Sequence, residues 1–207
     1  MSNQAQIPSV AYPSTFADAS RLDSAEIKAL LIQHLQLHSV LRGDFTLKSG
    51  RKSSWFIDSK QTACDPQGLI LVTTLMLRII PPEVVGIGGL TMGADPVSFA
   101  TGAVASAMGR RLSAFSVRKE AKDHGGGGRI AGILEAGSHV VITEDTVTRG
   151  SSIMDAVDVV RALGANVVLA TAIVDRGGTV GDMAMSRNIE FVPLVTALDL
   201  GFDFEGA

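Results

Sequence analysis

The sequence has little of what a disulfide-stabilised, membrane-spanning or nucleic-acid-binding protein needs. Its one cysteine, Cys64, cannot form an internal disulfide, so a reducing compartment, the cytoplasm, is expected. No apolar run reaches the roughly 18 to 20 residues of a membrane helix, and the polar N-terminus lacks the basic start and apolar middle of a secretory signal. A net charge of −3 argues against a nucleic-acid-binding surface.

What is present fits one domain with a sizeable core. The chain has 207 residues, 46% of them hydrophobic, and it is too short for a second full enzyme domain. Residues 1–20 show no periodicity and predict a flexible N-terminal extension or an arm that packs on another subunit, which leaves residues 21–207 for the domain. Positive charge gathers in residues 42–52 and 110–122, and such local basicity suits a small anionic ligand.

Apolar segments of strand length alternate with helical patterns along the chain. Helices are predicted after Asp23, after Asp65 to about Ile80, after Asp95, and over Ile153–Leu163. Strands are predicted at Val84–Ile87, Leu112–Val117, Val140–Thr143 and Val167–Val174. This alternation predicts an α/β fold with a mainly parallel, doubly wound sheet. Ahead of it, Phe45–Lys48 and Ser54–Asp58 predict a short hairpin outside the sheet, so that residues 21–62 form a small hood.

Residues 139–152 carry the strongest chemical signal in the sequence. An apolar strand ends in two adjacent acids, Glu144 and Asp145, followed by a loop of small hydroxyl and glycine residues and a helix beginning near Ser152. The acids can hydrogen-bond sugar hydroxyls, whereas the backbone N–H groups of the loop and the positive helix N-terminus can bind a phosphate. The order predicts a site for a phosphorylated ribose. The alternative is an ordinary strand-to-helix turn with an acidic N-cap.

This run resembles the phosphoribosyl-diphosphate (PRPP) signature of the type I phosphoribosyltransferases, and it is unlike a Walker A loop or a Rossmann glycine motif. Two more segments resemble the orotate phosphoribosyltransferases in particular. Residues 45–56 are similar to the segment that lies over the orotate ring. Residues 117–128 are similar to the mobile catalytic loop, with its Arg-Lys-x-x-Lys-x-His pattern and glycine tail. Together with Val-Asp-Arg at 174–176, the resemblance extends from about Asp44 to near residue 200.

The resemblance implies an enzyme of pyrimidine (UMP) biosynthesis that transfers ribose 5-phosphate from PRPP to N1 of orotate, giving orotidine 5′-monophosphate and pyrophosphate. It also implies Mg²⁺ held mainly by substrate oxygens without a compact protein cage, and a homodimer whose lid loop, about residues 118–130, reaches the neighbouring subunit. The implied catalytic residues are Lys122, His124, Glu144 and Asp145. The implied PRPP ligands are Lys48, Arg118, Lys119, Lys122, His124, Glu144, Asp145, Thr146, Val147, Thr148, Arg149, Gly150, Ser151 and Ser152. The implied orotate ligands are Lys48, Phe56, Thr148 and Arg176.

Three places depart from the family's pattern. Met92 and Gly93 stand where a lysine is common, so pyrophosphate is expected to be gripped differently there. Ile57 stands where a second aromatic is common, which predicts weaker ring stacking. Arg149 adds a cation inside the phosphate loop.

Alternatives remain for several of these features. A phosphoribosyltransferase for another base is disfavoured by Arg176 and the hood, which suit an acidic pyrimidine. A PRPP-sensing regulator without catalysis is disfavoured by the intact lid and the acidic balance. Gly125–Gly128 can be a plain linker instead of the hinge of a lid. His34 and His38 share a helix face, but without a further ligand nearby a structural role is favoured over a metal site.

Overall fold

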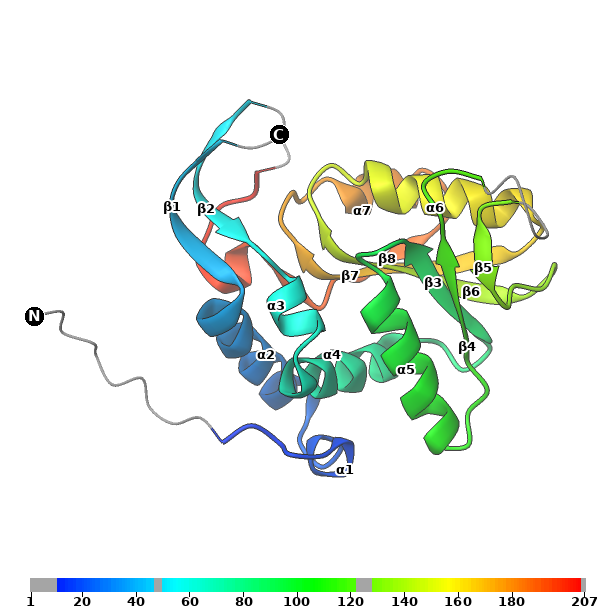
Figure 1. The fold of residues 1–207 in the computed structure, drawn as a ribbon, viewed down its shortest axis with the longest axis horizontal. Coiled ribbons are helices and arrows are strands. Elements are labelled where there is room, and N and C mark those ends of the chain that lie inside the picture. Colours follow the sequence, from blue (N-terminus) through cyan, green and yellow to red (C-terminus); the bar gives the residue numbers. More distant parts are fainter. Residues whose placement is uncertain (1–10, 47–49, 122–127, 206–207) are drawn as a thin grey trace, which may run out of the picture.

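The centre of the structure is a mainly parallel sheet, seen in a computed structural model that describes residues 11–46, 50–121 and 128–205 (Figure 1). The strand order is β5-β4-β3-β6-β7-β8, and β9 also pairs with β7. Every pair is parallel except β4 with β5. The strands are β3 (Gly86–Leu90), β4 (Ser113–Val117), β5 (Ile130–Gly132), β6 (His139–Val147), β7 (Asn166–Asp175), β8 (Glu190–Phe191) and β9 (Val195–Thr196).

Helices cover both faces of this sheet, which confirms the doubly wound α/β fold. In Figure 1, α4 (Pro66–Ile79) and α5 (Asp95–Ala107) lie below the sheet, and α6 (Ser151–Ala162) and α7 (Val180–Met185) lie above it. Two apolar clusters result. One includes Leu71, Met76, Ile87 and Ile173, and the other includes Phe115, Ile142, Ile153 and Val157.

Two of the predicted helix starts, after Asp23 and after Asp65, are confirmed by side-chain caps, whereas α5 begins at Asp95 itself and α6 begins at Ser151, both without one. Asp23 and Glu26 form a capping box at the start of α2 (Ser24–His38), in which each side chain accepts a hydrogen bond from the other's backbone N–H, at 2.8 Å and 2.7 Å. Asp65 caps α4 by accepting from Gln67 N and Gly68 N, both at 2.9 Å. These contacts are local, and a sequence pattern can therefore predict them.

Strand bounds differ from the prediction where tertiary pairing decides them. The strand expected at Val84–Ile87 begins at Gly86, and the strand expected to end at Thr143 continues to Val147. It continues because β7 pairs with it in parallel as far as the pair Val147 and Asp175. The two acids of the motif therefore lie within β6 and not after it. Short elements such as α3 (Lys60–Ala63), α7, β5, β8 and β9 were not predicted.

Within residues 21–62, the predicted hairpin is a separate two-stranded antiparallel sheet, β1 (Val40–Thr46) and β2 (Lys52–Ile57), and these two strands are called the hood below. Both strands are longer than the predicted hairpin, and they stand beside the main sheet with the C-terminal residues running along them (Figure 1). Residues 11–20, part of the segment assigned to the extension, include α1 (Phe16–Ala19), whose Ala19 is fully buried. Residues 1–10 lie outside the described residues.

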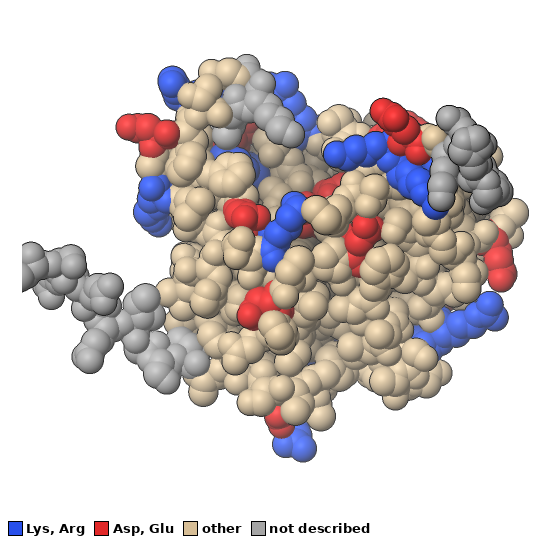
Figure 2. All heavy atoms as spheres, in the orientation of Figure 1, with Lys and Arg blue, Asp and Glu red and all other residues tan. Residues whose placement is uncertain are grey.

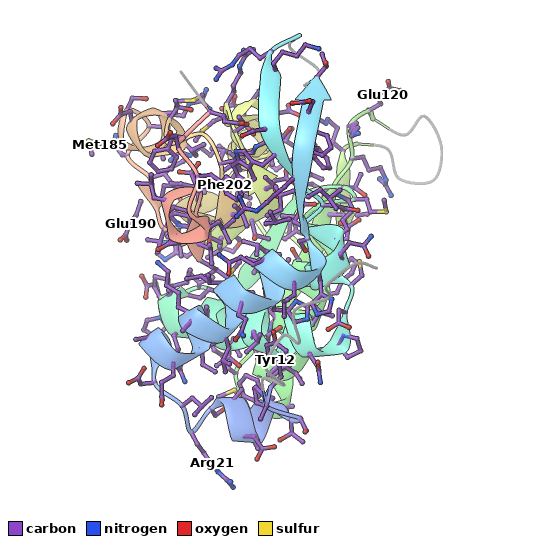
Figure 3. All side chains as sticks on the ribbon, turned by 90° about the vertical axis from the view of Figure 1, so that its left-hand side faces the viewer. Tyr12, Arg21, Glu120, Met185, Glu190 and Phe202 are labelled. Carbon is purple, nitrogen blue, oxygen red and sulfur yellow. The ribbon has the colours of Figure 1, made fainter. Side chains whose placement is uncertain are left out.

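His34 is buried and hydrogen-bonded within the protein. Its Nδ1 lies 3.1 Å from Thr62 Oγ1, and its Nε2 lies 3.1 Å from Asp65 Oδ1. Tyr12, visible beneath α2 in Figure 3, packs edge-on against its ring, with the ring centroids 5.3 Å apart. Among the described residues, no helix combines the length and hydrophobicity that a membrane crossing needs.

Candidate active site

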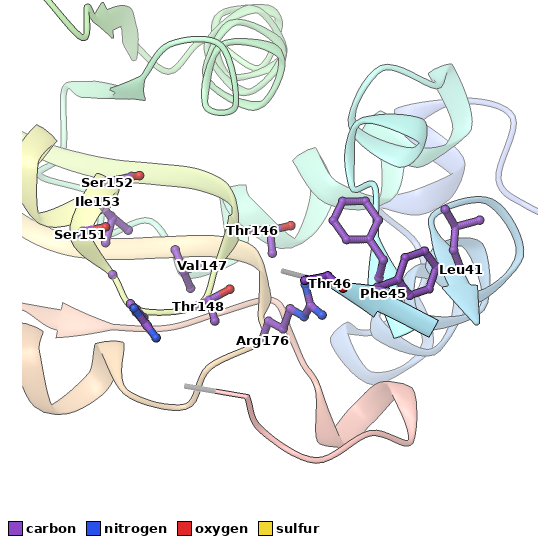
Figure 4. Close-up of a pocket in the computed structure, with 13 residues that line it drawn as sticks. Leu41, Phe45, Thr46, Thr146, Val147, Thr148, Ser151, Ser152, Ile153 and Arg176 are labelled. Atoms are coloured by element: carbon purple, nitrogen blue, oxygen red, sulfur yellow. The ribbon is translucent and has the colours of Figure 1, made fainter. Parts of the chain in front are cut away.

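A cavity of about 770 Å³ opens between the hood and the carboxyl ends of the central strands, where open α/β sheets bind ligands (Figure 4). The molecular surface is hollowed there, and acidic and basic side chains meet in the hollow (Figure 2). The cavity is lined by the residues that follow β6, by residues of the hood and by Arg176: Leu41, Phe45, Thr46, Phe56, Thr146, Val147, Thr148, Arg149, Gly150, Ser151, Ser152, Ile153 and Arg176.

Asp145 is a buried carboxylate that the protein itself neutralises. Its Oδ2 accepts from Lys60 Nζ at 2.6 Å and from Ser59 Oγ at 3.0 Å, and its Oδ1 accepts from the backbone N–H of Thr146 at 2.8 Å. Burial alone would raise the pKa of Asp145, but Lys60 and these hydrogen bonds outweigh burial and hold the pKa below its ordinary value. Asp145 is therefore ionised near neutral pH.

Glu144, its neighbour in β6, has the opposite electrostatic character. Its Oε2 is buried and has no hydrogen-bond partner among the described residues. Burial, followed by the charge of Asp145, raises the pKa of Glu144 to about 8. The two acids together therefore carry about one negative charge at neutral pH, with the proton on Glu144.

Gly93, in the loop after β3, lies against the acid pair. A Cβ atom at this position would lie 2.6 Å from Asp145 Oδ1 and closer still to Glu144 Oε1. A larger residue at 93 would therefore require the two carboxylates to shift, whereas Met92 beside it is 65% exposed. The cation that contacts the acid pair is Lys60, on α3. Ser59 and Lys60 were not predicted as site residues, because Lys60 lies 85 residues before Asp145 in the sequence. The only feature that could have indicated them is their position just after the second strand of the hood.

The phosphate loop leads from β6 into the N-terminus of α6. Gly150, with φ 77°, is the N-cap of α6. Because glycine has no side chain, the first backbone N–H groups of α6 have no side-chain cap. Ser151 and Ser152 are exposed beside them, as is Arg149. Val147 is buried, so only its backbone can contribute to the site, and its carbonyl accepts from Arg176 N at 2.8 Å. The loop offers a phosphate N–H groups, hydroxyls and one guanidinium.

The aromatic side chains in the cavity come from both strands of the hood. Phe56 is 39% exposed, and its ring lies 5.8 Å from that of Phe45 between centroids. Ile57, where a second aromatic was expected, is buried and faces away because side chains alternate along β2. The second aromatic ring in the cavity belongs to Phe45 on β1, which was not among the predicted orotate ligands.

Arg176 lies at the cavity wall but already has a carboxylate partner. Its Nη2 lies 2.5 Å from Glu205 Oε2, and it donates to Trp55 O at 2.9 Å and Ser53 Oγ at 3.2 Å. The guanidinium also lies over the Trp55 ring, 4.5 Å from its centroid. Thr148 and Arg176 lie side by side in Figure 4. No sequence pattern singled out Glu205, since acidic residues near a chain end are common.

The predicted lid is described only at its two ends. Lys48, Lys122, His124 and Gly125–Gly127 lie outside the described residues. Arg118 N donates to Arg129 O at 2.6 Å, Arg129 Nε donates back to Arg118 O at 2.7 Å, and Arg129 also forms an ion pair with Asp155 at 2.5 Å. The guanidinium of Arg118 donates to the carbonyls of Gly128 and Ile130, at 3.3 Å and 3.1 Å, and Lys119 is exposed. The roles of Arg118 and Lys119 in PRPP binding remain predictions.

The acid pair could contribute to a magnesium ion that is held mainly by its substrate. In the described ranges, no three His, Cys, Asp or Glu side chains gather into a metal cluster. The Oε2 of Glu144, unpartnered among the described residues, could bind such an ion once Glu144 has lost its proton, and Mg²⁺ is usually bound by one or two carboxylates together with substrate phosphates.

Similarity to known proteins agrees with this geometry. The chain is 36% identical over 179 residues to the orotate phosphoribosyltransferase of Nostoc sp., covering 86% of this chain and 87% of that protein. It is 40% identical over 158 residues to that of Streptomyces coelicolor, covering 76% and 87%. The solved structure of Mycobacterium tuberculosis orotate phosphoribosyltransferase in complex with PRPP aligns with a TM-score of 0.70 and 30% identity, covering 85% of this chain and 99% of that chain. No family model matches the chain.

Proposed function

We propose a role for each part of the cavity on the premise that the relatives establish: the chain belongs to the orotate phosphoribosyltransferase family. It transfers ribose 5-phosphate from PRPP to orotate, giving orotidine 5′-monophosphate and pyrophosphate in pyrimidine biosynthesis. The observation that carries the assignment of roles is the layout of the cavity. The paired acids directly precede Thr146, the first residue of β6 that lines the cavity, and the uncapped N-terminus of α6 follows. The guanidinium of Arg176 and the rings of Phe45 and Phe56 line the same cavity.

PRPP is proposed to bind along β6 and the loop after it. Glu144 and Asp145 would accept hydrogen bonds from the ribose hydroxyls, and residues 146–152 would bind the 5′-phosphate through N–H groups and hydroxyls. When the bond from C1 to pyrophosphate breaks, the leaving group takes the electron pair and the sugar becomes cationic. The buried negative charge of Asp145 is fixed before the reaction and stabilises that sugar at no cost in reorganisation.

Orotate is proposed to bind at the hood end, where N1 can attack C1. Arg176 would donate to the orotate carboxylate, Phe45 and Phe56 would flank the ring, and Thr148 would hydrogen-bond it. A test is the consumption of orotate in the presence of PRPP and Mg²⁺, with uracil and hypoxanthine as competing acceptors. We expect kcat/KM for orotate to exceed the values for uracil and hypoxanthine by at least about 100-fold, because these bases lack a carboxylate that can accept from the remaining donors of the guanidinium. Comparable turnover of uracil would reject the role of Arg176.

Mg²⁺ is the proposed cofactor, held mainly by oxygens of PRPP and in part by the acid pair. When bound, the ion would neutralise negative charge on the pyrophosphate. Lys48, Arg118, Lys119, Lys122 and His124 are proposed to complete that neutralisation from the hood and the lid. The single exposed cysteine, Cys64, supports a reducing compartment, and we propose the cytoplasm.

The proposed assembly is a homodimer in which the lid of one subunit closes over the phosphate loop of the other. The cluster of cations between Arg118 and Arg129 in the sequence supports this proposal. So do the hydrogen bonds between Arg118 and Arg129, which hold the two ends of that segment together. Lys122→Ala and Asp145→Asn chains should each be nearly inactive alone. After subunit exchange, hybrid dimers have one site with both normal elements, so activity should partly return. If verified hybrids stay inactive, the lid acts on its own subunit.

A further inference from the structure

Arg176 and Glu205 form part of a wall between two cavities. Arg176 lines the 770 Å³ cavity, together with the phosphate loop. In the described part of the chain, Glu205 lines a second cavity of about 590 Å³, beside Ser53, Trp55 and Phe202. Glu205 therefore contacts the guanidinium from the side away from the substrate.

The polar contacts of Arg176 with the protein are concentrated on one nitrogen. A guanidinium carries five N–H donors, and Nη2 is the nitrogen that donates to Trp55 and Ser53 and forms the ion pair with Glu205. Nε is buried and has no acceptor among the described residues. These contacts therefore leave part of the fork unused, and a planar carboxylate can accept from such a fork.

Several contacts hold Glu205 in this position. Glu205 N donates to Arg176 O at 2.9 Å, and the Ser53 hydroxyl donates to the Glu205 carboxylate. Two residues of the hood contact the preceding turn: the Trp55 ring stacks on Phe202 with centroids 4.2 Å apart and planes 4° apart, and the Arg42 guanidinium lies over the Phe202 ring, 4.6 Å from its centroid. Burial lowers the pKa of Arg176, and the charge of Glu205 opposes that shift.

We propose that Glu205 is a positioning residue for orotate binding: it holds Arg176 from behind so that the free donors of the guanidinium face the substrate cavity. The inference rests on the proposed pairing of Arg176 with the orotate carboxylate. It makes the C-terminal segment a part of the acceptor site, although Glu205 never touches the substrate. Arginine side chains have several rotatable bonds, and without this carboxylate the buried charge of Arg176 would lose its ion-pair partner and be held only by Trp55 and Ser53.

The test is Glu205→Gln, which keeps the size of the side chain and removes its charge. We expect the KM for orotate to rise on the order of tenfold, as is typical when the partner of a ligand-binding group is lost, with kcat and the KM for PRPP within about twofold of the wild type. Asp203→Asn is the matched control, because Asp203 is an exposed carboxylate of the same segment. It should leave all three constants unchanged.

Trp55 gives a second readout, because it is the only tryptophan of the chain and lies against both Arg176 and Phe202. Its fluorescence can be titrated with orotate to measure binding without turnover. In Glu205→Gln the dissociation constant should rise by the same factor as the KM, while the near-ultraviolet circular dichroism stays that of the wild type. Glu205→Asp, which keeps the charge but is one methylene shorter, should show a smaller loss.

The outcomes separate the two proposals. If Arg176→Lys leaves the KM for orotate unchanged, the proposed role of Arg176 is wrong. If Arg176→Lys raises it and Glu205→Gln does not, only the role of Glu205 is wrong. A rise of both KM values together with a lower kcat would also overturn the inference, since a merely structural residue would act in that way. If Glu205→Gln does not fold, the same criteria apply to Glu205→Asp.

Discussion

The acid pair beside the cavity and the guanidinium in its wall, here called the acid end and the guanidinium end of the site, both contain buried charge, but they are neutralised differently. At the acid end there are two carboxylates, Glu144 and Asp145, but among the described residues only one lysine, Lys60. The second negative charge is removed by a proton on Glu144. At the guanidinium end Arg176 and Glu205 pair one to one. Near neutral pH both ends are therefore close to neutral, but the charge of the acid end changes with pH through Glu144, whereas that of the guanidinium end does not.

This difference matches what each end is proposed to bind. A reacting ribose gains positive charge, and the carboxylate of Asp145, which is ionised before the reaction, would stabilise it. Orotate arrives with its charge already present, so a fixed fork of N–H donors gives selection by geometry more than by net attraction. The two ends should therefore respond separately to mutation, and the following experiments test that separation.

The largest effect is expected from Asp145→Asn. We expect kcat to fall by about 100- to 1000-fold, as for other groups that stabilise a transition state electrostatically, with little change in melting temperature. Asp158→Asn, on the exposed face of α6 where Asp158 pairs with Arg187, is the control and should stay fully active. Near-normal kcat in Asp145→Asn would show that the acid pair does not stabilise the sugar.

A smaller effect is expected from Gly93→Ala. Because the new methyl group would collide with both carboxylates, the acid pair must shift, and kcat/KM for PRPP should fall by about 10- to 100-fold. Gly181→Ala, in α7 where no atom lies within 4 Å of an added Cβ, should have no effect. Orotate binding measured by Trp55 fluorescence should not change in either variant. A large change there would mean that the two ends are coupled.

The smallest effect is expected in the pH dependence of stability. The pKa of Glu144 is about 8 in the folded protein against an ordinary value of 4.5, so the folded state holds a proton that the unfolded state has released between these values. The free energy of unfolding should therefore fall as the pH rises through this window, by about 1 to 2 kcal/mol from about pH 6 to about pH 8. Glu144→Gln should lose this dependence in urea titrations. An equal slope in both proteins would contradict the raised pKa.

Much of the fold and the donor site could be predicted from the sequence because the signals are local. The capping residues Asp23 and Asp65, the alternation of strands and helices, and the order of acids, small residues and helix in 139–152 each depend on neighbours within a few positions. The bounds of β6 were less predictable, since they depend on how far β7 pairs with it.

The sequence by itself therefore determined the fold class, the family and the position of the phosphate loop. Only the tertiary structure decided that Lys60 neutralises Asp145, that Gly93 lies against both acids, that Phe45 provides the second ring and that Glu205 holds Arg176. These contacts join residues from separate elements, and pairs such as Lys60 with Asp145 are far apart in the chain. Periodicity and motif order describe the neighbours of a residue along the chain, whereas the charge of a buried group is set by its neighbours in space.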